Sequence, residues 1–312
     1  MRKILKVNYY FFIIMVLSVF APFFLNRIYI SMNITDSRLV LLFNHLLIFL
    51  VPAIIYILVT KESFKDTLKL NKLQWKDMII LIILGFVVQP VMNFFSVISS
   101  LFFTNDVGEY IVSISSTPYF LLLGLVAVLP SITEEVTLRG VVLSGYEAKN
   151  KYVAALVTGL FFGIFHLNAQ QFLYAVLMGF ILALVVRITN SIFASMIIHF
   201  IVNGTSVSLV KLLDVLSEGM NIAQETTTTS ILDMNIYVII TLITIWLIIA
   251  LAFGVLVWLC IYYLERNNRK RVDKLQENSL EVNSKSERII NIPFILTILL
   301  YIVCMWRILF KN

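Results

Sequence analysis

Charge is scarce in this chain of 312 residues, because Asp, Glu, Lys and Arg together make up only 13%. An average soluble domain carries about a quarter. Hydrophobic residues account for 60%, and the mean hydropathy is +0.94. This composition excludes an ordinary soluble domain. It predicts an all-α, polytopic transmembrane helical bundle of about eight to nine spans, each an apolar run of about 20 residues. The runs lie at roughly 8–25, 39–59, 78–103, 119–145, 152–167, 171–187, 190–210, 235–264 and 289–309.

Cysteine is also scarce, with only Cys260 and Cys304 in the whole chain. Two cysteines exclude a disulfide framework and a cysteine zinc cluster. The two residues fall toward opposite faces of the bilayer in the expected arrangement of spans. They are therefore too far apart to form a disulfide.

Basic residues are absent from the expected external loops at 104–118 and 212–234, which carry only acids. If the N-terminus is cytoplasmic, 19 of the 24 Lys and Arg residues fall on the cytoplasmic side, as the positive-inside rule requires. The net charge of +6 then reflects membrane anchoring, and nucleic acid is not expected as a partner.

The chain shows no internal repeat and no separable soluble domain. We divide it into N-terminal transmembrane helices at 1–118, a central core at 119–210 and C-terminal transmembrane helices at 211–312. A basic cytoplasmic linker, flexible or helical, is expected at 265–288.

Three charges interrupt one of the most apolar stretches, PSITEEVTLRG at residues 130–140. Each unpaired charge near the bilayer centre costs about 2.5 to 3.5 kcal/mol, so a partner or a function is required. Residues four apart share a helical face, which pairs Arg139 with Glu135 and turns Arg139 away from Glu134. Pro130 is expected to kink or restart the helix upstream. Glu134 is therefore predicted to be a free intramembrane carboxylate beside a structural ion pair.

Two of the three histidines lie in spans downstream of these acids. His166 ends the fifth span, and His199 lies in the seventh with Asn203 on the same helical face. At 1.5 Å per residue, Glu134 and these three residues all lie roughly 16 to 22 Å from the cytoplasmic ends of their helices. This shared depth predicts that the four side chains meet near mid-membrane.

Several neighbouring residues of these spans are expected to support the polar set. Gly159 and Gly163 form a GxxxG pattern that allows a second helix to approach closely. Phe162, four residues before His166, is expected to stack on the same face and exclude water. His45, in the second span, has no evident partner, and Gln170 and Gln171 are expected to cap an external turn.

This inventory fits amide hydrolysis without a covalent intermediate. A buried carboxylate and an imidazole can polarise a water molecule together, with the carboxylate as general base. A second imidazole and an amide on one helical face can supply hydrogen bonds to an oxyanion. No serine and histidine pairing for nucleophilic chemistry is evident.

Three ordered motifs carry a family resemblance: EExxxR at 134–139, FxxxH at 162–166 and HxxxN at 199–203. Together they resemble the CAAX-protease and bacteriocin-processing family of intramembrane proteases, also called CPBP or Abi, over about residues 119–210. The resemblance implies an intramembrane endopeptidase in which Glu134 and His166 activate water. It implies that His199 and Asn203 form the oxyanion site, with Glu135, Arg139 and Phe162 in support.

The sequence leaves three competing functions open. A zinc-dependent protease would use Glu134, His166 and His199 as ligands, as the metalloprotease label often given to the family suggests. We favour no cofactor, because the chain has no HExxH and because Asn203 has a role only in the metal-free reaction. The second competing function is a non-catalytic membrane scaffold or bacteriocin-immunity protein, and the third is a proton-coupled transporter. The transporter would be expected to show an inverted repeat, which the chain lacks.

The expected partners are membrane lipid and a membrane-bound protein or peptide substrate. Compact loops and abundant Lys, Ile and Asn favour a multi-pass protein of a bacterial cell membrane. A leader peptide or membrane protein is then a more plausible substrate than a prenylated one.

Overall fold

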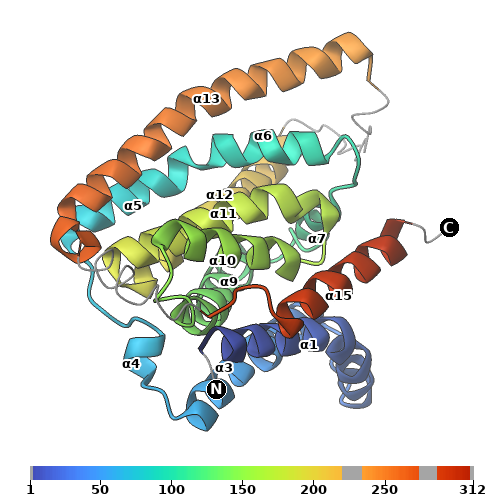
Figure 1. Cartoon of the computed structure of the whole chain (residues 1–312). Coiled ribbons are helices and arrows are strands. Elements are labelled where there is room, and N and C mark those ends of the chain that lie inside the picture. Colours follow the sequence, from blue (N-terminus) through green and yellow to red (C-terminus); the bar gives the residue numbers. More distant parts are fainter. Residues whose placement is uncertain (1–2, 220–233, 274–286, 310–312) are drawn as a thin grey trace.

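The computed structural model describes residues 3–219, 234–273 and 287–309. Within these ranges the chain forms helices joined by turns, with no β-strand (Figure 1). The helices are α1 (Lys3–Ser31), α2 (Ser37–Asn44), η1 (His45–Leu50), α3 (Val51–Thr60), α4 (Phe64–Thr67), α5 (Trp75–Val87), α6 (Gln89–Ser99), α7 (Asp106–Ser113), α8 (Tyr119–Leu123), η2 (Gly124–Val128), α9 (Leu129–Glu135), η3 (Val136–Val142), α10 (Lys151–Phe165), α11 (Ala169–Thr189), α12 (Ile192–Gly219), α13 (Ile236–Asn267) and α15 (Ile292–Leu309).

The prediction of an all-α polytopic membrane protein is confirmed. Seven helical stretches of the described chain are long and apolar enough to cross a membrane, and α10 and α15 are shorter apolar helices. Large hydrophobic side chains are exposed along the outer helices, and α13 buries only 11% of its most apolar window. Such an apolar outer surface is suited to lipid.

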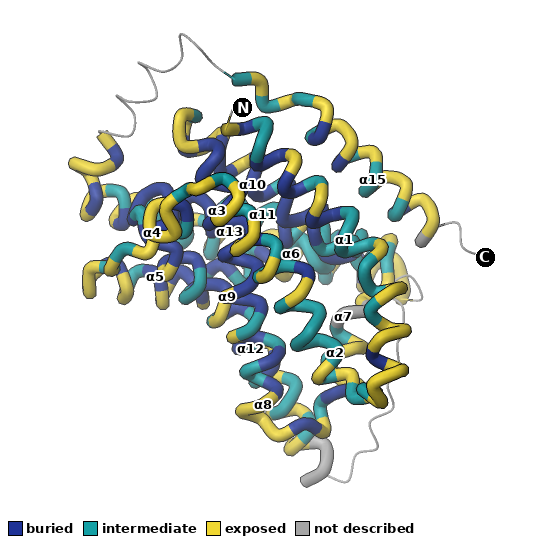
Figure 2. Tube along the Cα trace, turned by 90° about the horizontal axis from the view of Figure 1, so that it is seen from below, coloured by how far each residue is buried: buried dark blue, intermediate teal, exposed yellow. Residues whose placement is uncertain are grey.

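The helices that carry the polar motifs form the interior of the bundle. Burial reaches 56% in the most apolar window of residues 119–142 and 44% in that of α12, against 11% to 28% in the outer spans (Figure 2). One buried apolar cluster contains residues from all three expected segments of the chain, including Ile4, Val141 and Leu264. The polar set is therefore enclosed by protein on most sides.

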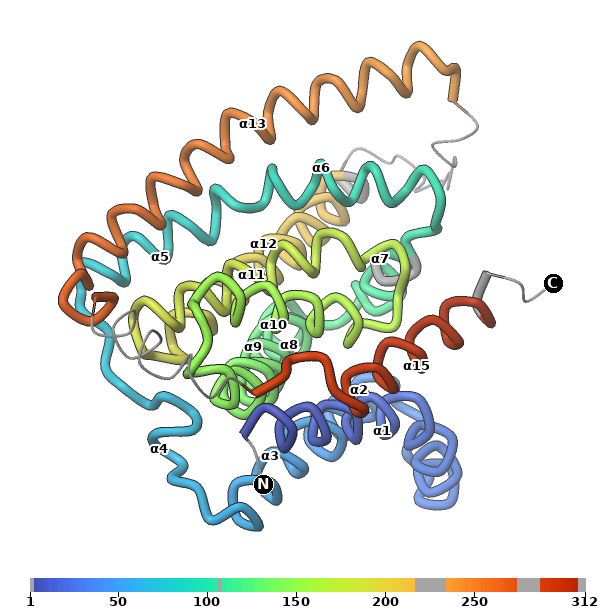
Figure 3. The backbone as a smooth tube through the Cα atoms, viewed as in Figure 1, coloured from blue at the N-terminus to red at the C-terminus, as the bar shows by residue number. Residues whose placement is uncertain are grey.

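Basic residues hold together the helix ends on the side expected to be cytoplasmic. Lys69 pairs with Glu147, and Lys151 pairs with Glu265 at 2.8 Å. Arg187 donates from Nη2 to the backbone oxygen of Glu147 at 3.0 Å. In the same region the C-terminal end of α13 lies beside the N-terminal end of α5 (Figure 3), where Asn268 donates to Asp77. These contacts gather the basic residues at one end of the bundle.

One expected loop boundary was wrong. Helix α12 continues to Gly219, so residues 212–219 are helical rather than part of an external loop. Helix α13 continues to Asn267, and the expected linker was allowed to be flexible or helical, so its helical start does not contradict that expectation. Residues 274–286 of that linker lie outside the described residues. Helix α12 extends because Leu212, Leu213 and Leu216 continue its apolar pattern past Lys211.

Candidate active site

Pro130 shapes the helix that carries the acidic motif. The chain forms the π-helical segment η2 immediately before α9, in which Pro130 occupies the first turn. Proline has no N–H to donate to Val126, four residues earlier. The Val126 carbonyl instead accepts a hydrogen bond from Asn203 Nδ2 at 3.1 Å. The expected disruption at Pro130 is thus present, and it joins α12 to the acidic helix.

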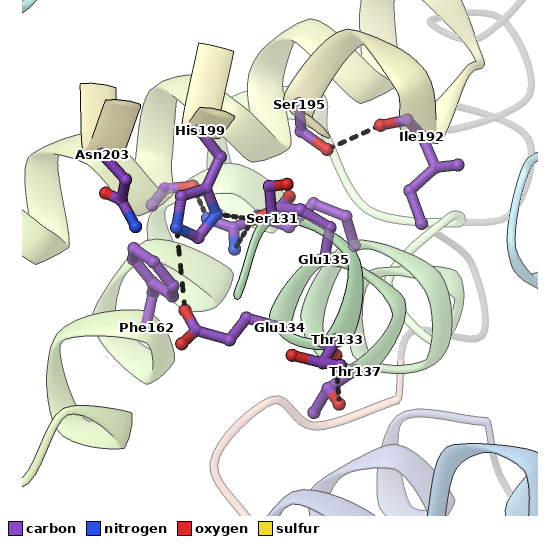
Figure 4. Close-up of polar contacts among 12 residues, drawn as sticks. Ser131, Thr133, Glu134, Glu135, Thr137, Phe162, Ile192, Ser195, His199 and Asn203 are labelled. Carbon is purple, nitrogen blue, oxygen red and sulfur yellow. Dashed lines mark hydrogen bonds and ion pairs between the residues drawn. The ribbon is translucent and has the colours of Figure 1, made fainter. Parts of the chain in front are cut away.

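A cavity of about 380 Å³ lies beside this helix. Its walls include all four candidate catalytic side chains: Glu134, His166, His199 and Asn203. Figure 4 shows Glu134, His199 and Asn203 approaching one another from two helices, with the ring of Phe162, from the third helix α10, beside them. The four side chains therefore line one cavity, as their similar depth along the helices predicted.

Glu134 presents a carboxylate to the cavity. Its Oε2 atom is buried and has no hydrogen-bond partner in the described part of the chain. The nearest cationic or imidazole group is His199, whose Nε2 lies 3.9 Å from that oxygen. An unpartnered buried carboxylate oxygen is costly unless a water or substrate group satisfies it, so this atom marks a place for a reactant.

Glu135 and Arg139 form the ion pair predicted from their spacing. Arg139 Nη1 lies 3.0 Å from Glu135 Oε1, and both side chains are fully buried. The guanidinium also donates from Nη2 to the Gly179 backbone oxygen at 3.2 Å. Its central carbon lies 4.4 Å from the centre of the Phe162 ring. Arg139 therefore links the acidic helix to both α10 and α11.

Glu135 also binds His199, a contact that the spacing within one helix could not predict. His199 Nδ1 lies 2.9 Å from Glu135 Oε1 (Figure 4). A carboxylate only accepts, so Nδ1 carries the proton and donates. The ring is thereby fixed with Nε2 directed toward Glu134. Glu135, which was predicted to belong to a structural ion pair, therefore also orients His199.

His166 is held by its own helix. Its Nδ1 lies 2.7 Å from the backbone oxygen of Phe162, and a carbonyl can only accept. The neutral ring therefore carries its lone pair on Nε2, which is free to accept a proton or a hydrogen bond. Glu134 was expected to lie near His166. The two residues line the same cavity, but among the described residues no hydrogen bond joins them directly.

Phe162 contacts both imidazoles. Its ring centre lies 4.6 Å from that of His166 and 5.8 Å from that of His199, with nearly perpendicular planes. We expected stacking, and the contacts are instead edge-to-face. The Phe162 ring therefore contacts His166, His199 and the Arg139 guanidinium, and it fixes the spacing among these three groups.

The glycine pattern allows α10 and α11 to approach closely, as expected. A β-carbon at Gly159 would lie 2.7 Å from the backbone nitrogen of Phe180. One at Gly179 would lie 2.7 Å from Phe162 Cβ. Both are shorter than real contacts, so the close packing that brings Gly179 to Arg139 requires these glycines.

His45 lines the cavity and has a partner that the sequence did not indicate. Its Nδ1 lies 2.9 Å from Thr133 Oγ1, and that hydroxyl donates its own proton to Leu129. His45 must then donate from Nδ1, which leaves Nε2 as a lone pair in the cavity wall. Its position in the sequence could have indicated this placement, because all three histidines of the protein lie within or at the end of apolar spans.

The expectation that Gln170 and Gln171 cap a turn was wrong. Asn168 caps α11 by accepting from the backbone of Gln171. Gln170 donates to Ser96 Oγ at 2.9 Å and lines the cavity. The side chain turns inward because α6 presents hydroxyl groups to it at the same depth.

A zinc site would require Glu134, His166 and His199 to converge on one point. No group of three or more His, Cys, Asp or Glu side chains within residues 3–219, 234–273 and 287–309 has the spacing to hold a metal ion. The arrangement therefore does not fit the zinc site considered above, and we derive no step through a metal.

Residues 116–205 match a family model described as type II CAAX prenyl endopeptidase Rce1-like. The matched segment contains Glu134, His166, His199 and Asn203. No curated protein and no solved structure matches the chain.

Proposed function

Because residues 116–205 match the Rce1-like CAAX protease family, we propose that this integral membrane protein is an intramembrane endopeptidase. It hydrolyses a peptide bond of a membrane-associated protein or peptide. The observation that carries the proposal is the partnerless Glu134 oxygen, which faces a cavity shared with two oriented imidazoles and an amide.

Glu134 and His166 act on the water. The water donates one hydrogen bond to the Glu134 carboxylate and a second to His166 Nε2, which holds its oxygen in place. As that oxygen bonds to the carbonyl carbon, Glu134 takes a proton and the carbonyl electrons move to the carbonyl oxygen. Glu134 then returns the proton to the amine nitrogen as the C–N bond breaks. The products are a free carboxyl end and a free amino end.

His199 and Asn203 act on the oxyanion. Glu135 accepts from His199 Nδ1, and its negative charge stabilises a ring that donates from both nitrogens. Asn203 gives one amide N–H to Val126 and keeps the second for the substrate. Two donors on one face of α12, both lining the cavity, match the requirement for stabilising the tetrahedral intermediate.

The Glu135–Arg139 pair and Phe162 position these groups rather than react. The guanidinium neutralises Glu135, so the carboxylate can support His199 without leaving an unpaired buried charge. Phe162 separates this pair from the cavity, because its ring packs against both Arg139 and the two imidazoles. The substrate we favour is a leader peptide or membrane protein rather than a prenylated tail.

Detergent-purified protein assayed against a peptide library by mass spectrometry tests the proposal. We expect defined internal cuts that disappear in Glu134→Gln, because the amide keeps the shape of the side chain and removes the base. Glu62→Gln, which alters a carboxylate outside the cavity, is the matched control and should cut normally. If the purified protein cuts no peptide, the proposed function is wrong. If Glu134→Gln cuts as fast as the parent protein, Glu134 is not the general base.

A further inference from the structure

The cavity extends from the candidate catalytic groups toward one end of the bundle. Asn105 and Tyr110, at its far wall, lie in the segment expected to face the outside. Ser206 lies seven residues beyond His199 on α12, about 10 Å farther toward the same end. Lys69, Glu147 and the remaining residues that join the basic helix ends do not line it. The positive-inside rule places that basic end in the cytoplasm.

Uncharged polar groups line the path. Gln89, Asn93 and Ser96 follow one face of α6 at spacings of four and three residues, and all three line the cavity. Gln170 donates across the space to Ser96 Oγ at 2.9 Å. Asn93 is exposed and makes no hydrogen bond with the described residues, so its amide is available to a ligand. Amide and hydroxyl groups of this kind can pair with the N–H and C=O groups of a polypeptide backbone.

The charges of the lining restrict the ligand further. Among the described lining residues, Glu134 is the only acid, and none is Lys or Arg. A substrate cut close to its C-terminus would bring a free carboxylate into this lining, which holds no lysine or arginine to receive it. Burial of an unpaired charge is strongly unfavourable. The lining therefore suits an internal, uncharged stretch of chain and disfavours the terminal carboxylate of a CAAX tail.

From these observations we infer that the cavity opens to the non-cytoplasmic face and receives an internal, uncharged stretch of a polypeptide that reaches the membrane from that side. Cleavage of this segment rests on the proposed function, whereas the direction of opening does not. The substrate class is thus an exported or outer-leaflet segment of a membrane-associated polypeptide.

Cysteine labelling in intact cells tests the direction of opening. The background is Cys260→Ala with Cys304→Ala, because neither native cysteine lines the cavity. Ser206→Cys places a thiol in the cavity wall, and Leu209→Cys places one on an exposed apolar face of the same helix, nearer its external end. Ala148→Cys reports the expected cytoplasmic turn.

A membrane-impermeant maleimide added outside should label Ser206→Cys at least about tenfold faster than Leu209→Cys, because a lipid-facing thiol lacks the water that stabilises its reactive thiolate. Ala148→Cys should react only after the membrane is opened. Labelling of Ser206→Cys only from the cytoplasmic side, or no faster than Leu209→Cys, would overturn the inference.

A second measurement concerns the substrate. A peptide that the purified protein cuts is compared with a version truncated so that its free C-terminal carboxylate lies three residues beyond the cut, and with the same truncation ending in an amide. We expect the acid to be cut at least about tenfold more slowly than the amide, given the cost of burying an unpaired charge. Equal rates would overturn the assigned substrate chemistry. If no peptide is cut at all, the proposed function fails, and the labelling result still decides the opening.

Discussion

Replacement of Arg139 by methionine should destabilise the protein strongly. Arg139 has no exposed surface, and it is paired with an equally buried Glu135. Methionine retains much of the volume but leaves the Glu135 charge without a cation and the Gly179 oxygen without its donor. Breaking a buried pair by removing one partner costs about 3 to 5 kcal/mol. The melting temperature should fall on the order of 10 °C.

Thermal unfolding of the detergent-purified variants measures this effect. Arg38→Met is the matched control, because the pair of Arg38 with Asp36 lies at the surface, where ion pairs contribute little to stability. The double variant Glu135→Gln with Arg139→Met removes the stranded charge while keeping an acceptor for His199, so it should recover a large part of the loss. An Arg139→Met protein that melts like the parent would refute the reasoning. If that protein were also inactive, the arginine would have a direct role in substrate binding or catalysis.

Two further predictions concern the oxyanion donors and the helix contact behind them. Asn203→Ala should lower turnover by about 100-fold to 1000-fold with little change in substrate binding, as expected for loss of one oxyanion donor; a changed KM with unchanged kcat would argue against this role. Gly179→Ala forces a β-carbon against Phe162 and should cost about 1 to 3 kcal/mol together with activity, measured by melting and by cleavage. Gly254→Ala, which meets nothing within 4 Å, should behave like the parent, and equal effects of the two substitutions would contradict the packing argument.

Contacts within one helix were the most predictable part of the site. The Glu135–Arg139 pair follows from a spacing of four residues, and the break at Pro130 follows from the missing N–H. Such features depend only on helical periodicity, so the sequence is enough to derive them.

Contacts between helices were less predictable. The sequence placed His199 at the right depth, but its rotation toward Glu135 depends on how α12 packs against the acidic helix. His45 was left without a partner because Thr133 approaches it across 88 positions of the chain. Gln170 turned inward because Ser96 on a third helix offers a hydroxyl group. The depth of a residue in the membrane can be counted along its helix. The rotation of that helix about its axis relative to its neighbours cannot be read from the sequence.

Metal dependence tests most directly whether side chains alone activate the water. Both His166 and His199 donate from Nδ1 to a fixed acceptor, which is also how metal-ligating imidazoles are oriented. The measurement is cleavage by protein stripped with a strong chelator, together with elemental analysis of the same sample. We expect the stripped protein to keep its turnover and to contain far less than one zinc per chain. One zinc per chain, with activity lost on stripping and restored in proportion to zinc occupancy, would contradict the account and make His199 a ligand.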